Sequence, residues 1–304
     1  MRSKSPILVA VFTLLVLSGS SAFAGILEPR PVQVTPNDEF GGVGNADYFA
    51  WTLDTPRGSD AVKVRVRPTS GSEFSLNDEG RWFVGGMNET GSLLSYYRVT
   101  GSRNLTSDVH LYDMAARSRV GVPDGVNTAK FEYFPALSGN SMIFVRRGRV
   151  SATLWLIPDR STGEKFEIKT VDSDRAFFSN APNLLGNWLT YSLCRQAGCE
   201  AYRYDIGLRN TVTVPHETGT YSFAPSADLA GNVYFEQSGR YCGAHAKLMK
   251  WTGTGQPSMF YSFDPGRDMN GTSVYDDGAG SVTVYADVFG CNRTNQNIVS
   301  FANP

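Results

Sequence analysis

The chain has 304 residues, a formal net charge of −1 and no extended basic run. This charge balance argues against electrostatic binding to nucleic acid. No segment beyond the first 24 residues is apolar enough to span a membrane. A chain of this length can bury a full core, as one domain or as two.

The N-terminal segment has the pattern of a signal peptide. Arg2 and Lys4 precede an apolar run from Ile7 to Leu17, and residues 22–24 read Ala-Phe-Ala, which suits cleavage. We expect residues 1–24 to be removed and residues 25–304 to be exported to the periplasm or the cell exterior. Loss of the two basic residues would change the formal net charge from −1 to about −3.

The rest of the chain repeats itself with a period of roughly 47 residues. In each copy a glycine in a turn precedes a β-rich run. The glycines are Gly44, Gly91, Gly139, Gly186, Gly231 and Gly280. A second series with the same period marks the end of another run, at Arg67, Asp113, Asp159, Asp205, Thr252 and Ala302. Two series with one period indicate a single repetitive domain over residues 25–304.

Each copy predicts four short strands, because β-branched and aromatic runs alternate with Gly, Asn, Asp and Pro turns. The second strand of the copies is predicted, in chain order, at Tyr48–Leu53, Leu93–Arg98, Ser141–Arg146, Trp188–Leu193, Val233–Glu236 and Val282–Asp287. The third is predicted at Val62–Val66, Val109–Tyr112, Thr153–Ile157, Ala201–Tyr204, Lys247–Trp251 and Asn297–Phe301. No stretch shows sustained helical periodicity.

Six copies of this content predict an all-β fold, a six-bladed β-propeller with four-stranded antiparallel blades. A β-sandwich would also contain many short strands, but not six equal copies. The sixth copy ends after its third strand. Residues Pro31–Pro36 resemble the fourth-strand segment Thr211–Pro215, so we expect the N-terminal strand to join the last blade and close the ring. The alternative is a loose N-terminal tail.

The copies resemble the degenerate blades of the TolB-like six-bladed β-propellers, which are related to the WD40-like group. The resemblance rests on the tract Phe223–Phe235, on Phe134–Phe144, and on the strands Leu154–Asp159 and Ala201–Asp205, which end in Asp. The family's usual Ser-Pro-Asp-Gly turn is approached only between Ser226 and Gly231. The resemblance implies protein–protein contact in the bacterial envelope and supplies no catalytic residues.

All four cysteines lie in the exported part, where disulfides can form. Cys194 and Cys199 flank a predicted hairpin turn, which suits a disulfide between facing strand ends. Cys242 and Cys291 occupy corresponding loops of adjacent copies, so we expect a second bridge between them. A zinc site using Cys242 and His245 is the alternative.

Acidic residues occur in every predicted linker between consecutive blades, on the face that also carries the cysteine loops. They are Asp38, Glu39, Asp78, Glu79, Asp124, Asp172, Asp174, Glu217, Asp264 and Asp268. Together they could form a negative rim around the channel mouth that attracts cations or a basic ligand. The competing interpretation is that acids are common turn formers. We expect no resident cofactor apart from calcium, which such a rim could bind.

Several features argue against catalysis. The chain has three His, no G-x-S-x-G element, and no evident convergent set of catalytic side chains. The sequence therefore predicts a monomeric, non-catalytic module that binds a protein or envelope component, basic in character, through loops on one face. The alternative is a carbohydrate-active or metal-dependent hydrolase or lyase with its site in the channel, for example using Asp172 and Glu217. Trp51, Trp82 and Tyr96 suit packing between blades better than stacking on sugars.

Overall fold

The computed structural model describes residues 29–33, 37–54, 62–76, 80–101, 106–239, 246–291 and 296–302. The regular structure in these ranges is entirely β-strand. None of the described residues forms a helix long and apolar enough to cross a membrane. The predicted signal peptide lies outside the described residues.

The first half of the chain forms one twelve-stranded sheet, in which antiparallel runs are joined by single parallel pairs. The parallel pairs are Val62 with Arg81 and Ser107 with Phe131. The strands are β2 (Asp38–Gly44), β3 (Tyr48–Asp54), β4 (Val62–Pro68), β5 (Phe74–Ser75), β6 (Arg81–Met87), β7 (Leu93–Thr100), β8 (Thr106–Asp113), β9 (Ser118–Val120), β10 (Phe131–Ser138), β11 (Ser141–Arg147), β12 (Ser151–Ile157) and β13 (Phe166–Asp172).

The second half forms three smaller antiparallel sheets. The five-stranded sheet contains β14 (Ala176–Phe178), β15 (Asn183–Leu185), β16 (Trp188–Arg195), β17 (Gly198–Asp205) and β18 (Asn210–Thr213). The next contains β19 (Tyr221–Ala227), β20 (Val233–Ser238), β21 (Lys247–Trp251) and β22 (Ser258–Ser262). The last contains β23 (Arg267–Asp276), β24 (Val282–Gly290), β25 (Asn297–Ala302) and β1 (Arg30–Gln33).

The predicted strands are confirmed closely. All six predicted second strands begin at the residue where β3, β7, β11, β16, β20 and β24 begin. Most of these strands are rich in apolar residues and each follows a turn glycine, so both their composition and their start are visible in the sequence.

The N-terminal strand pairs with the last strand of the chain, as predicted. Arg30 lies opposite Ser300 and Pro31 opposite Val299 in the antiparallel pair of β1 and β25. Residues 34–36 of the predicted segment lie outside the described residues. The pairing covers an edge of β25 that would otherwise expose unpaired backbone groups.

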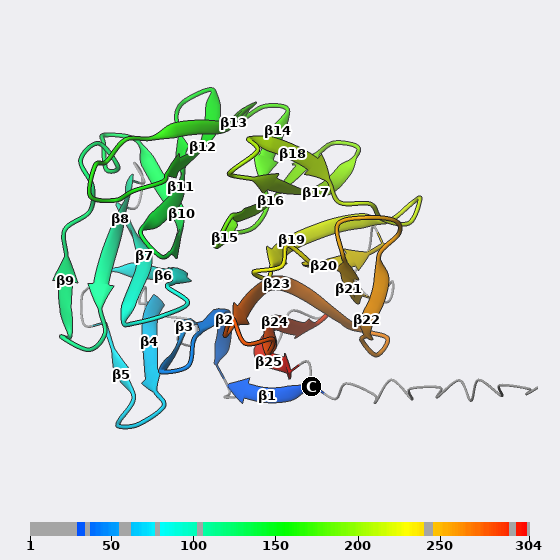
Figure 1. The fold of residues 1–304 in the computed structure, drawn as a ribbon, viewed down its shortest axis with the longest axis horizontal. Coiled ribbons are helices and arrows are strands. Elements are labelled where there is room, and N and C mark those ends of the chain that lie inside the picture. Colours follow the sequence, from blue (N-terminus) through cyan, green and yellow to red (C-terminus); the bar gives the residue numbers. More distant parts are fainter. Residues whose placement is uncertain are drawn as a thin grey trace, which may run out of the picture.

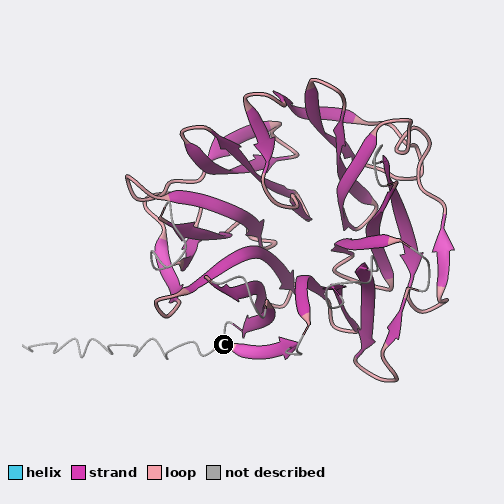
Figure 2. Cartoon of the chain, turned by 180° about the vertical axis from the view of Figure 1, so that it is seen from behind, coloured by secondary structure: helices cyan, strands magenta, loops and turns pink. Residues whose placement is uncertain are grey.

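The sheets lie side by side around a common centre, and β2, β6, β10, β15, β19 and β23 are the strands nearest to it (Figure 1; Figure 2 shows the same arrangement from behind). The core lies between neighbouring sheets rather than in the middle. In one cluster Ile143 and Leu154 pack with Leu189 and Leu193 of β16. Trp51, Trp82 and Tyr96 are each 1% exposed, so these aromatic side chains serve packing, as expected.

Hydrogen bonds link each run of strands to the next around the centre, in addition to the apolar packing. In the first half of the chain, the amide of Val84 donates to Thr52 Oγ1 (3.0 Å), and Ser95 Oγ donates to the carbonyl of Pro135 (3.2 Å). Further along, the amide of Gly186 donates to Ser138 Oγ (2.7 Å), and Thr190 Oγ1 donates to the carbonyl of Pro225 (2.7 Å). Thr272 Oγ1 donates to the carbonyl of Ala224, and the amide of Gly41 donates to Asp287 Oδ2 (2.8 Å). The last of these joins the final sheet to β2, the first strand of the twelve-stranded sheet.

Candidate functional site

The strands nearest the centre are interrupted at corresponding places. The strand register shifts between Phe40 and Val43, Val84 and Met87, Tyr133 and Ala136, Phe223 and Ser226, and Met269 and Gly271. In the five-stranded sheet, β14 and β15 are two pieces that pair with the same strand, β16. β-Bulges bend a strand and redirect its side chains, so these interruptions shape the centre.

The backbone at three of these interruptions adopts the left-handed region. The φ angles are 66° at Gly41, 52° at Phe134 and 43° at Ala224. Such angles cost free energy for residues other than glycine and persist only where the surrounding structure enforces them. All three residues line the same central cavity.

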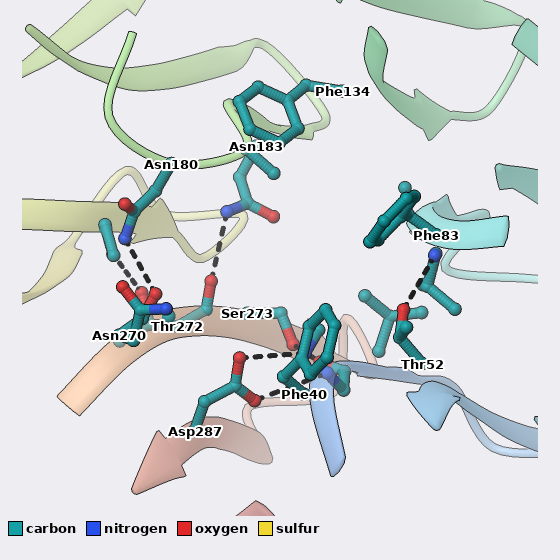
Figure 3. Close-up of a pocket in the computed structure, with 18 of the residues that line it drawn as sticks. Phe40, Thr52, Phe83, Phe134, Asn180, Asn183, Asn270, Thr272, Ser273 and Asp287 are labelled. Atoms are coloured by element: carbon teal, nitrogen blue, oxygen red, sulfur yellow. Dashed lines mark hydrogen bonds between the residues drawn. The ribbon is translucent and has the colours of Figure 1, made fainter. Parts of the chain in front are cut away.

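The central cavity has a volume of about 230 Å³ and is bordered by several sheets. One part of its wall is aromatic and another is polar, as Figure 3 shows. The aromatic residues are Phe40, Phe83, Tyr97, Phe134 and Tyr285, and the polar residues are Thr52, Ser179, Asn180, Asn183, Asn270, Thr272, Ser273 and Asp287.

Two amides of the polar wall are held in place by backbone carbonyls of β23. Asn180 Nδ2 donates to the carbonyl of Asn270 (2.8 Å), and Asn183 Nδ2 donates to that of Thr272 (3.1 Å). The amide nitrogens are thus occupied by the protein, and the Asn183 oxygen points toward the side of the cavity where Phe83 lies (Figure 3). This wall presents an acceptor of fixed direction to a ligand.

Asp287 is a buried carboxyl at the edge of the same cavity. It accepts hydrogen bonds from the amides of Gly41 (2.8 Å) and Gly42 (3.5 Å). Burial raises the pKa of Asp287 to about 7, although the two amide donors oppose that shift. Gly271 makes room for it, since a Cβ there would lie 2.7 Å from Asp287 Oδ2.

A second, more open cavity of about 410 Å³ adjoins the first and is here called the mouth cavity. Asn180 and Asn270 line both. Its other walls come from the turn between β16 and β17, from β19 and β20, and from the first residues of β23. Glu236 and Asp268 meet in it and share a hydrogen bond.

Only some residues of the predicted acidic rim lie in linkers between blades, as the sequence predicted. Four of the predicted rim residues lie within strands and not in linkers, which corrects that placement: Asp38 and Glu39 in β2, Asp172 at the end of β13, and Asp268 in β23. The strands extend further than expected because their first residues pair across the sheet: Asp38 lies opposite Asp54 in β3, and Asp268 lies opposite Phe289 in β24. Asp38 Oδ1 also accepts from the amide of Gln296 (3.1 Å).

The other rim residues are dispersed. Asp172 pairs with Arg175 (3.6 Å) and Glu217 with Lys247 (3.2 Å), whereas Asp124, Asp174 and Asp264 are exposed. Asp78 and Glu79 lie outside the described residues. Of the described rim residues, Asp268 alone lines one of these two cavities. Binding of a ligand by the rim stays a prediction.

Disulfide formation is confirmed for the first cysteine pair, Cys194 with Cys199. The bridge spans the end of the β16–β17 hairpin, where these residues face each other. Cys291 is also disulfide-bonded. Cys242, its predicted partner, and His245 lie outside the described residues. Within the described residues, no three His, Cys, Asp or Glu side chains are placed to hold a metal ion.

Sequence reasoning missed Glu236, Asp287 and the asparagines of the centre as site residues. A signal for the two acids was present, because each ends a predicted strand that is otherwise largely apolar. A signal for two bulges was also present: Gly41-Gly42 and Gly85-Gly86 interrupt β-rich runs, as bulge glycines do. Asn180 lies between β14 and β15, Asn183 begins β15 and Asn270 lies within β23, and no sequence pattern marks them as site residues.

Comparison with solved structures identifies the fold. The β-propeller domain of the Trilobed protease from Pyrococcus furiosus matches with a TM-score of 0.53 at 10% identity, covering 88% of this chain and 94% of that one. A protein of unknown function from Dyadobacter fermentans matches with a TM-score of 0.60 at 9% identity, covering 90% and 97%. An acylaminoacyl peptidase from Pyrococcus horikoshii gives 0.53 at 12% identity, covering 89% of this chain and 47% of that one. The chain therefore has a β-propeller fold, and at these identities the likeness extends to the fold alone.

Comparison with protein sequences does not show a family for this chain. No protein-family model matches the chain, so the resemblance to TolB-like propellers stays a prediction. Among curated proteins, the mitochondrial kinesin-like protein KIN-7D of Arabidopsis thaliana is 36% identical over 132 residues. That match covers 41% of this chain and 12% of the kinesin-like protein.

Proposed function

We propose that the chain is an exported, non-catalytic six-bladed β-propeller that binds a protein or cell-envelope partner through the face carrying the mouth cavity. The six blades are the six runs of antiparallel strands that begin with β2, β6, β10, β14, β19 and β23. In this proposal the last blade takes β1 as its fourth strand. The hydrogen bonds between neighbouring runs, including those from the amides of Gly41 and Gly42 to the carboxyl of Asp287, support a closed ring.

The observation that carries the binding role is the pair of connected cavities at the centre. An aromatic wall, amides of fixed direction and an open mouth are the usual composition of a site that holds a ligand group by packing and a few hydrogen bonds. The central cavity, at about 230 Å³, suits one or two side chains of a partner better than a large substrate. The mouth cavity adjoins it, because Asn180 and Asn270 line both.

Catalysis is less well supported by the described residues. Asp172 and Glu217, the example from the sequence, are each engaged in a separate ion pair. The hydrogen-bonded carboxyls of Glu236 and Asp268 are closer than the roughly 5–9.5 Å that separates the two acids of glycosidases. We therefore place binding ahead of the enzyme alternative.

Export is proposed on two grounds. The N-terminal 24 residues have the composition of a signal peptide. The disulfides at Cys194–Cys199 and at Cys291 suit an oxidising compartment such as the periplasm or the cell exterior.

Blocking the central cavity should abolish binding. Ala181 lies between β14 and β15 and lines the central cavity, so Ala181→Trp would fill part of this cavity. The mature chain is used to capture proteins from envelope extract, and the captured partner, purified separately, is titrated by calorimetry. We expect Ala181→Trp to weaken binding at least tenfold.

The matched control is Ala279→Trp, in the exposed turn after the far end of β23. It should bind within about twofold of the unmodified chain. Equal affinity of both variants and the unmodified chain would contradict a role for the cavity. Circular dichroism melting verifies that both variants fold.

A further inference from the structure

The mouth cavity contains a carboxyl pair of unequal burial. Glu236 on β20 is 3% exposed, and Asp268 on β23 is partly exposed. Burial, and then the neighbouring Asp268, raise the pKa of Glu236 well above its usual range. This shift favours the protonated form of Glu236, which can donate a hydrogen bond to Asp268.

The walls around this pair are aromatic. Tyr221, Phe223 and Phe289 line the cavity, and Phe177 stands beside them with 57% of its side chain exposed. Ring faces attract cations, and the attraction grows when the cation is partly removed from water. An exposed phenylalanine beside a buried acid gives the mouth cavity both an apolar rim and a negative interior.

Arg195 is the other charged residue that lines the mouth cavity among the described residues. Its guanidinium donates to Glu200 Oε2 (3.0 Å) and to the Tyr202 hydroxyl (3.4 Å), so a carboxylate outside the cavity balances its charge. Cys194 and Cys199, which also line the cavity, are disulfide-bonded and do not titrate. The carboxyl groups of Glu236 and Asp268 are thus the acidic groups that face the mouth cavity.

We infer that the mouth cavity receives a lysine or arginine side chain of the partner, held between the aromatic walls and the Glu236–Asp268 carboxyls. This inference rests on the proposed function and names its partner class: a peptide segment that presents a basic side chain. Because Asn180 and Asn270 line both cavities, a neighbouring apolar side chain of that segment can enter the central cavity. On arrival of the cation, Glu236 releases its proton to the solvent, and the carboxyl groups of Glu236 and Asp268 face the ligand.

The probe is a positional library of acetylated hexapeptides in which one position is lysine, arginine, glutamine or norleucine, the uncharged analogue of lysine. Peptide binding is measured by fluorescence polarisation on the mature chain. We expect lysine and arginine peptides to bind at least tenfold more tightly than their norleucine counterparts. The double variant Glu236→Gln/Asp268→Asn, which keeps the size of both side chains, should reduce that ratio to within twofold of one.

Asp264→Asn is the matched control, because it removes an exposed acid that lies close to Asp268 in sequence and outside both cavities. It should retain the basic preference. If peptides bind with no basic preference, or if the preference survives in the double variant, the inference is wrong while the proposed function stands. If no peptide or captured protein binds at all, the proposed function itself fails.

Proton release provides an independent measurement. Calorimetry at pH 6.5 in two buffers of different ionisation enthalpy should detect release of up to about one proton per lysine peptide bound. The single variant Glu236→Gln has no such proton to lose, so its binding should release none. Equal release by this variant and the unmodified chain would overturn the assignment of the proton to Glu236.

Discussion

Asp287 places a titrating group at the contact between the last sheet and β2. Its pKa is about 7 in the folded protein and 3.8 in an unperturbed carboxyl. The folded state therefore retains a proton that the unfolded state loses between these pH values, and stability falls as pH rises from about 4 to about 7. The asparagine of Asp287→Asn resembles the protonated acid and does not ionise.

The unfolding free energy of the Asp287→Asn variant, relative to that of the unmodified chain, should increase as pH rises. We expect similar unfolding free energies near pH 4.5 and a gain for the variant on the order of a few kcal/mol near pH 7.5. Urea unfolding at both pH values measures this, with the exposed Asp174→Asn as control. A difference between variant and unmodified chain that does not change with pH would contradict the prediction.

Individual residues also mark the limit of sequence-based prediction for the site. Cys194 and Cys199 could be paired because their spacing fits one hairpin turn. Glu236 and Asp268 could not, since they are 32 positions apart in sequence and meet only through the packing of β20 against β23. A carboxyl pair formed between sheets leaves no local spacing for a pattern to detect.

At the scale of elements, β1 is expected to stabilise the chain through its packing as well as its backbone pairing. Val32 packs against a cluster of Phe49, Trp51 and Ile298, and its carbonyl accepts from Arg67 Nη1 (3.2 Å). Val32→Asp would bring a charge against these apolar side chains. We expect a loss of about 1–3 kcal/mol in the unfolding free energy, measured by urea titration.

Val150→Asp is the matched comparison, because Val150 is 65% exposed. It should change the unfolding free energy by less than about 0.5 kcal/mol. Should both substitutions have the same effect, β1 would not contribute through this cluster.

Strand prediction succeeded where each strand shows its own signal, and it missed the bulges. The second strands are apolar, follow a turn glycine and recur with a fixed period. The bulges at Phe134 and Ala224 carry no glycine, so the left-handed backbone there is imposed by neighbouring strands. The proline that follows each of them, Pro135 or Pro225, is the local signal of a bulge. The rim residues Asp38 and Asp268 were misplaced for a related reason: polar strand ends look like linkers.

At the scale of the whole molecule, disulfides are expected to contribute a large part of the stability. Thiol titration of the unfolded, unreduced chain should find no free thiol, and non-reducing peptide mapping should link Cys291 to Cys242. The six-residue loop of Cys194–Cys199 is worth about 2 kcal/mol by chain entropy, and the loop from Cys242 to Cys291 about 4 kcal/mol. Reduction should accordingly lower Tm, and Cys291→Ser should lower it more than Cys199→Ser.

The pairing of β1 with β25 has a consequence for how the protein is made. β1 leaves the ribosome or a translocation channel well before Asn297–Ala302 and must wait for that segment, because its hydrogen-bonding partner lies there. Until then β1 has no strand to pair with. In a polypeptide truncated before β25, β1 would stay unpaired and exposed to proteases and chaperones. An unpaired β1 would thus distinguish chains that lack β25 from chains that contain it.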